Sequence, residues 1–173
     1  MQITLKLENI EAVKRKLEDI EGNITDTAPL MGEIANYLKN QAVDSFENER
    51  DWNNKPWSPL SSATYLFKQK KGKPDKKLFY DGGMQGALIS ESDNDSAIVG
   101  ITTVNDDDYF YPIVHQFGTN NAGRNKKLTI PARSFLPINA DGSLYEGVEN
   151  IITKITVEFI ESGLWNPAVT RLK

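Results

Sequence analysis

Residues 84–104 read MQGALISESDNDSAIVGITTV, and this stretch decides the fold class. Its two apolar segments, MQGALISES and SAIVGITTV, are joined by the polar turn SDND. Two strand-like segments around a short polar turn predict a β-hairpin. Because the other regular segments of the chain are mostly helical, the pattern indicates an α+β domain, in which about three main helices pack on a small, mostly antiparallel sheet and long polar loops connect them.

Two helical segments precede the hairpin, after a short strand pattern. The alternating run ITLKL at residues 3–7 is typical of a half-buried strand. Apolar residues then recur at helical spacing over residues 10–20, and Gly22 is the expected stop of this helix. A second, longer helix is expected over residues 26–49.

The third main helix is expected near the end of the chain. Ser143 and Glu146 have the spacing of a capping box, which marks the start of a helix. Gly163 is the expected stop. Between these points lies an apolar stripe at helical spacing, formed by Val148, Ile151, Ile152, Ile155 and Phe159. Ahead of this helix, LTIPARSFLPI reads as an extended segment whose prolines favour an edge strand or a bulge.

Composition sets the outer limits of the function. The 173 residues are enough for one domain, expected to span residues 1–173 with a basic loop at about 50–81 and a short tail at about 164–173. The net charge of −4 gives no support to a globally basic nucleic-acid binder, and the absence of cysteine excludes disulfides and cysteine zinc sites. With no apolar run of membrane length and no apolar signal-peptide core, the chain is expected in the cytosol.

The stretch YPIVHQFGT at residues 111–119 contains the single histidine, His115. A hydrolase centred on His115 needs a nucleophile and an orienting acid around it, and the chain has no Gly-x-Ser-x-Gly elbow. The pattern favours a histidine satisfied by hydrogen bonds at a turn or an interface, with the hydrolase as the less favoured alternative. The preceding acidic run, residues 106–108, lacks the spacing of a calcium loop and is interpreted as solvated. No metal or cofactor site is predicted.

Residues 68–77, KQKKGKPDKK, hold six lysines and one aspartate. Such a run is expected to be a mobile, solvated loop, with docking on an acidic protein surface and contact with nucleic acid as alternatives. Nearby, Trp57 in KPWSPL either pins its loop onto the core or anchors a partner.

Five motifs, taken in order, resemble a known family. They are WSPLSSAT from Trp57, LFYDGGM from Leu78, AIVG from Ala97, YPIVHQFGT from Tyr111 and IPARSFL from Ile130. Together they are similar to the phage virion morphogenesis family of Mu-like phages and prophages, whose members act in tail completion. The pair HQFG and IPARSFL, with a polar loop between, is the most specific part of the resemblance.

The resemblance implies a structural role without enzymatic activity or cofactor. It implies a protein of tail completion or head–tail joining, forming a ring at the neck of the particle, with six copies expected. Its partners would be other tail and neck proteins and, through the lysine loop, the exiting genome. The protein would be found in the virion and, during assembly, in the host bacterial cytoplasm. A nucleic-acid-binding accessory protein that uses the lysine loop is the alternative function.

The resemblance also implies roles for single residues. In the motif pair, His115 and Gln116 would hydrogen-bond the backbone of the following loop, and Gly118 would let the chain turn sharply. The structural motif comprises His115, Gln116, Phe117, Gly118, Pro131, Arg133, Phe135 and Leu136.

Two loop segments are the expected docking surface. Residues 50–77 and 119–127 are polar and are expected to be poorly ordered until a partner binds, because neither can offset its ordering entropy by burial. The candidate docking residues are Trp57, Lys70, Lys71, Lys73, Lys76 and Lys77.

Overall fold

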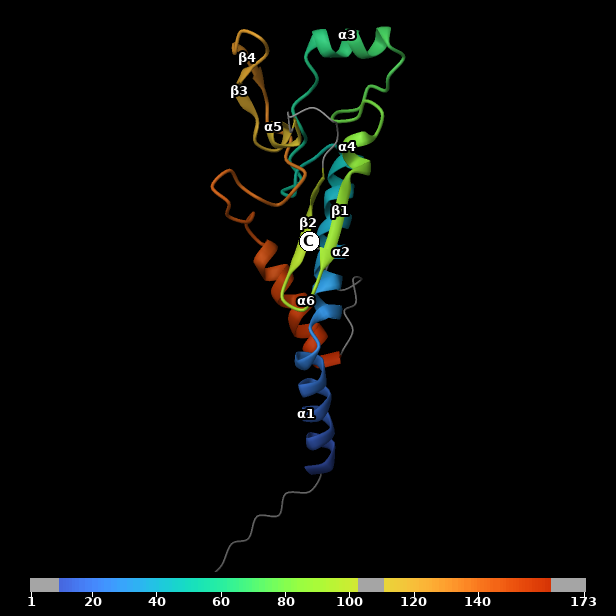
Figure 1. Cartoon of the computed structure of the whole chain (residues 1–173), viewed down its shortest axis with the longest axis vertical. Helices are drawn as coiled ribbons and strands as arrows, with labels where there is room; N and C mark the ends of the chain where they lie inside the picture. Colours follow the sequence, from blue (N-terminus) through green and yellow to red (C-terminus); the bar gives the residue numbers. More distant parts are fainter. Residues whose placement is uncertain (1–9, 103–110, 163–173) are drawn as a thin grey trace, which may run out of the picture.

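A computed structural model describes residues 10–102 and 111–162 of the chain. Within these ranges the chain forms six helices and two antiparallel hairpins, arranged along an elongated molecule (Figure 1). The α+β class is confirmed, although the strands of the described residues form two separate two-stranded sheets instead of one. The strand expected at residues 3–7, the acidic run at 106–108 and the tail from residue 164 lie outside the described residues.

The long helix α2 (Ala28–Asn48) is the spine of the fold. The C-terminal helix α6 (Val148–Ser162) packs against it. The predicted stripe on α6 is confirmed, because four of its five residues are buried and Ile152 is partly buried. We call this part of the core the helical cluster; it comprises Leu30, Ile34, Tyr37, Ile151, Ile155 and Phe159.

The predicted hairpin is confirmed over most of its length. Strands β1 (Leu88–Ser92) and β2 (Ala97–Ile101) pair antiparallel, from Leu88 opposite Ile101 to Ser92 opposite Ala97. Both strands lie along α2 (Figure 1). The start of the predicted first strand instead forms a short helical turn, α4 (Gly83–Gly86). The residue before it, Gly82, has a left-handed backbone conformation.

The first helix, α1 (Ile10–Thr25), runs past the expected stop at Gly22. The reason is a tertiary contact: the Asn23 side-chain amide donates to the carbonyl oxygens of Phe159 (3.2 Å) and Ile160 (3.1 Å) at the end of α6. Carbonyls in the last turn of a helix have no partner within the helix, so Asn23 supplies one. This contact ties α1 to α6 and outweighs the low helix propensity of glycine.

The capping-box prediction for α6 is wrong. The Ser143 N–H and hydroxyl both donate to the Asp141 carboxylate, at 2.9 and 2.6 Å, which makes a local turn instead of a helix cap. Gly147 has a left-handed backbone conformation, with φ 87°, and directly precedes α6, which begins at Val148.

The two polar segments of the expected docking surface both contain regular structure. In the first, Ser61 accepts from the Thr64 N–H (3.2 Å) and starts helix α3 (Ser62–Lys70). In the second, β3 (Thr119–Ala122) forms a hairpin with β4 (Leu128–Ile130), which begins the LTIPARSFLPI segment that was expected to be extended. Polar side chains and backbone groups of these segments bond to one another, as Thr119 does with the Asn121 N–H, and the proposal that a partner orders both segments stays a prediction. Among the described helices, none is long and apolar enough to span a membrane.

Candidate functional site

The motif YPIVHQF forms a helix, α5 (Tyr111–Phe117), that the sequence did not predict. It ends at Gly118, which has φ 75° and whose N–H donates to the Val114 carbonyl (2.8 Å). A Cβ on Gly118 would lie 2.8 Å from the backbone nitrogen of Ala132. Glycine is thus required both by the left-handed conformation and by the close passage of the PARSFL segment.

Gln116 connects the two motifs through its side chain. Its Oε1 accepts from the backbone N–H groups of Phe135 and Leu136, each at 3.0 Å. Its Nε2 donates to the carbonyls of Leu136 (2.9 Å) and Ile138 (3.1 Å). Gln116 is buried, so these four bonds satisfy both polar atoms of its amide inside the protein.

The PARSFL segment is also held from its other side, by the loop that follows α2. The Arg133 guanidinium is buried and donates to the carbonyls of Ser58 and Pro59, each at 2.9 Å. The indole N–H groups of Trp52 (2.9 Å) and Trp57 (3.0 Å) donate to carbonyls of the same segment. Pro131 directly follows β4, so the predicted strand ends before the proline.

These contacts enclose the second part of the core, which we call the braced cluster. The Phe135 ring packs against Phe46, with 5.1 Å between the ring centroids, and Leu136 packs against the cluster. Phe117, in contrast, is exposed. The braced cluster comprises Ala42, Phe46, Trp57, Met84, Leu88 and Phe135.

The prediction of Trp57 as an anchor for a partner is wrong. Its side chain is 5 % exposed and packs edge-on against Phe46, with ring centroids 5.7 Å apart. A proline-rich loop suggested an exposed residue, but the loop turns its indole into the core. Trp57 therefore pins the loop onto the core, which was the other reading of this residue.

His115 belongs to the first motif, and its ring lies against Tyr111 with 6.1 Å between the centroids. Its backbone carbonyl accepts from the Arg133 N–H (2.7 Å), whereas its Nδ1 is buried and has no hydrogen-bond partner among the described residues. Burial, and then the positive charge of Arg133, lower the pKa of its imidazole. The hydrogen bonds to the following loop thus come from the His115 backbone and the Gln116 side chain.

The lysine loop is partly built into the structure. Lys68 is buried and its ammonium donates to the carbonyls of Lys76 and Phe79. Lys77 forms an ion pair with Glu49 at 2.6 Å. Burial raises the pKa of the Glu49 carboxyl, but the bonds and charge of Lys77 outweigh it and lower that pKa. The expectation that this run cannot bury its lysines is thus wrong for Lys68.

The remaining lysines border an exposed aromatic surface at one end of the molecule. Phe67 and Tyr80 stack at 6.4 Å between centroids, and the Lys73 ammonium lies 4.4 Å from the Tyr80 ring centroid. Lys76 lies over Phe79 at 5.5 Å. We call this region the α3 surface; it comprises Leu66, Phe67, Lys70, Lys71, Lys73 and Tyr80.

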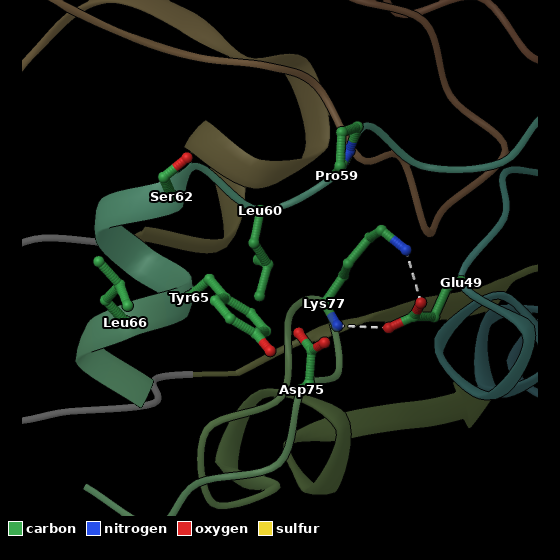
Figure 2. A pocket seen from close by; sticks show the side chains of 8 residues that line it. All are labelled: Glu49, Pro59, Leu60, Ser62, Tyr65, Leu66, Asp75 and Lys77. Carbon is green, nitrogen blue, oxygen red and sulfur yellow. Dashed lines mark hydrogen bonds and ion pairs between the residues drawn. The ribbon is translucent and has the colours of Figure 1, made fainter. Parts of the chain in front are cut away.

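A hollow of about 520 Å³ lies between α3 and the end of α2 (Figure 2). Figure 2 shows Tyr65 and Leu60 on one side and the Glu49–Lys77 ion pair on the other, with Asp75 between them. Two of its three charged groups neutralise each other. The hollow therefore lies between α3 and the rest of the protein. It does not bring together charged groups that could act in catalysis.

The described residues contain no arrangement that resembles a catalytic centre. No group of three or more His, Asp or Glu residues in the described ranges could hold a metal ion. His115 Nδ1 has no acid beside it among these residues, which a catalytic triad would require.

Several important residues gave no recognisable signal in the sequence. Trp52, Glu49 and Lys68 each make contacts described above with residues at least eight positions away. Tyr80 and Leu66 lie on the α3 surface, but only the folded chain brings Tyr80 to Phe67. Phe67 and Phe79, which flank the lysine run in the sequence, were the one available hint of an aromatic surface.

The comparisons with known proteins agree with this arrangement of motifs. The model of the phage virion morphogenesis family matches residues 8–155. The chain belongs to the phage virion morphogenesis family. It is 31 % identical over 135 residues to "Mu-like prophage FluMu G protein 2" of Haemophilus influenzae, across 78 % of this chain and 83 % of that protein. No solved structure matches the chain.

The matched region of this virion morphogenesis protein includes every contact between the two motifs. It begins before α1 and ends within α6, at Ile155 of the helical cluster. The protein therefore has a role in phage morphogenesis and is a structural protein of phage origin. The interaction partners that this role requires are other phage structural proteins.

Proposed function

We propose that the protein is a non-enzymatic subunit of tail completion or head–tail joining, and that the whole chain acts as one domain in a ring at the neck of the particle. The observation that carries the proposal is the direction in which the motif residues point. Gln116, Arg133 and Phe135 are buried and hold the backbone of neighbouring segments. The motifs thus maintain a shape, which is the task of an assembly subunit.

The exposed groups support the same proposal. Large apolar side chains stand on the surface at the end of the molecule that carries the motifs, including Phe67 on α3, Ile113 on α5 and Leu128 on β4. Clusters of exposed apolar residues mark interaction sites. In the proposed ring, of six copies as the family resemblance implies, they contact neighbouring subunits and other tail or neck proteins. Assembly takes place in the host cytoplasm.

Deletion of the gene from an inducible prophage tests this function. We expect loss of infectious particles, restored by the chain supplied from a plasmid, and heads and tails that remain separate or tails of abnormal length in electron micrographs. Micrographs also distinguish the two steps, since unjoined but complete tails indicate head joining. Normal titres and normal particles after deletion would contradict the proposal.

One observation favours a second function. The stacked Phe67 and Tyr80 with Lys73 resemble the combination of aromatic and basic groups that binds single-stranded nucleic acid. Contact with the exiting genome would use this surface. Salt-dependent binding of DNA by the purified chain, lost on changing Lys70 and Lys71 to glutamate, would support it.

A further inference from the structure

We propose that the α3 surface of one copy docks on the acidic turn of a second copy, in a head-to-tail contact. The acidic turn is the connection between β1 and β2 with its flanking acid, and comprises Glu91, Asp93 and Asp95. This inference rests on the proposed self-association and names the two surfaces that make it.

The α3 surface offers an apolar centre with a basic border. Leu66 is 54 % and Phe67 52 % exposed, and both project from a helix that makes few contacts with the rest of the fold (Figure 1). Lys70 and Lys71 are exposed at the end of the same helix and have no ion-pair partner among the described residues. Burial of the aromatic rings would supply binding energy, while the lysines select a negative partner.

The acidic turn has the complementary charge and a fixed shape. The Asp93 carboxylate accepts from the backbone N–H groups of Asp95 (2.8 Å) and Ser96 (2.7 Å). These bonds lower the pKa of Asp93, so the group stays charged. The Thr27 hydroxyl donates to the Asn94 carbonyl and holds the turn against the start of α2. In the described part of the chain, no ion pair neutralises these acids.

An exposed apolar residue lies next to the acidic turn, where the aromatic rings of the α3 surface can contact it. Ile98 on β2 pairs with Glu91 on β1 and is 51 % exposed. A contact between the two surfaces can therefore bury Phe67 near Ile98 while the lysines meet the acids.

The α3 surface has the opposite charge to the chain as a whole. Residues 66–80 carry six lysines and one aspartate, whereas the whole chain has a net charge of −4. The α3 surface is thus a basic region on an otherwise acidic protein. Bound nucleic acid would account for this region but would leave the acidic turn without a role, whereas contact between copies uses both.

The positions of the two surfaces set the geometry of the contact. The turn lies at the far end of the β1–β2 hairpin from α3, so the two surfaces of one copy cannot meet (Figure 1). A contact between two different surfaces is heterologous and repeats from copy to copy, so it forms a ring when the rotation between copies closes and an open filament when it does not.

Two charge-reversed variants test the contact in the purified full chain. Lys70→Glu/Lys71→Glu makes the α3 surface acidic, and Glu91→Lys/Asp95→Lys makes the turn basic. Each variant alone places like charges opposite each other, and we expect its self-association to weaken by about tenfold or more in sedimentation equilibrium. An equal mixture restores opposite charges at every contact and is expected to restore association. The control Arg15→Glu/Lys154→Glu, at two other exposed basic residues, should associate like the wild type.

Cross-linking reports the same contact where association is weak. The chain has no cysteine, so Lys71→Cys and Asp95→Cys introduce single reactive sites. With a bismaleimide linker, a mixture of the two variants should give cross-linked dimers, the double variant should give a ladder, and each single variant should stay monomeric.

Three results would overturn the inference. They are a mixture that associates no better than its components, cross-linking of the Lys71→Cys variant to itself, and lysine variants that lose DNA binding while self-association is unchanged. Because these measurements use the purified chain, they are independent of the deletion phenotype. A positive result together with a normal deletion titre would preserve the contact and reject the proposed function.

Discussion

The two core clusters share α2 but are stabilised in different ways. The helical cluster joins α2 to α6 through apolar side chains at regular helical spacing. The braced cluster takes only Ala42 and Phe46 from α2, and its other members come from loops, the short helix α4 and the hairpin. Those loops are held by side chains such as Gln116 and Arg133 that bond to backbone groups. Periodic packing is enough for the first cluster, whereas the second depends on polar groups that must all be satisfied.

The largest expected effect is loss of the central ring of the braced cluster. Phe46 is 1 % exposed and contacts both Trp57 and Phe135. Phe46→Ala would leave a cavity between these rings and is expected to lower the free energy of unfolding by about 3–5 kcal/mol. Urea denaturation followed by tryptophan fluorescence measures this change. A loss below about 1 kcal/mol would show that the cluster is not closely packed.

Removal of the Gln116 amide tests whether polar bracing matters as much as packing. Gln116→Leu keeps the approximate volume but leaves two N–H groups and two carbonyls without their partner. We expect a loss of about 3 kcal/mol in urea denaturation, because unsatisfied buried groups are costly.

The matched control is Gln116→Glu. Its carboxylate retains acceptors for Phe135 and Leu136 but cannot donate to Leu136 and Ile138. Because the ionised carboxylate would be a buried charge facing two carbonyl oxygens, Gln116→Glu is expected to be no more stable than Gln116→Leu at pH 7 and to gain stability at lower pH, where the carboxyl is protonated. A Gln116→Leu variant as stable as the wild type would show that the braced cluster is held by apolar packing alone.

A smaller effect is expected from a single indole. Trp57→Phe keeps an aromatic ring beside Phe46 but removes the N–H donated to Ser134. The expected loss is about 1–2 kcal/mol, from the unpaired carbonyl and the reduced ring size. Thermal unfolding by circular dichroism measures it. A change as large as that of Phe46→Ala would mean that Trp57, and not Phe46, is central to the cluster.

The smallest effect concerns pH and His115. Burial, and then the charge of Arg133, lower the pKa of this imidazole from 6.5 in the folded protein. The unfolded chain therefore binds a proton first as pH falls, so the free energy of unfolding should begin to decrease below about pH 6.5 and level off below the folded-state pKa. His115 is the single histidine, so urea denaturation between about pH 7.5 and 5.5 isolates this group. His115→Asn should remove the slope, and an unchanged slope would contradict the assignment.

The sequence predicted the helical cluster and much less of the braced one, for a physical reason. The stripe from Val148 to Phe159 repeats at the period of a helix, so its burial could be predicted locally. The bonds of Gln116 and Trp57 instead connect residues 18 or more positions apart, and no local pattern reveals them.

Local composition was misleading where tertiary contacts dominate. The stretch YPIVHQFGT was interpreted as a turn or an interface around His115, yet residues 111–117 form α5, and Pro112 is tolerated in the first turn of this helix. The polar stretch before Leu128 suggested a loop, but its first residues form β3, which pairs with β4. Trp57 was predicted as an anchor because a proline-rich loop is usually exposed, and the fold buries it.

The most direct test of this account compares a bracing residue with the surface residues. Stability and phage titre are measured together for Gln116→Leu and for Lys70→Glu/Lys71→Glu, by urea denaturation and by complementation of a prophage deletion. We predict that Gln116→Leu lowers the free energy of unfolding, whereas the lysine variant unfolds like the wild type and still lowers the titre. Two results would contradict the account, in which Gln116 stabilises the fold and the lysines of the α3 surface take part in assembly. They are a lysine variant with wild-type titre, and a Gln116→Leu protein with wild-type stability and reduced titre.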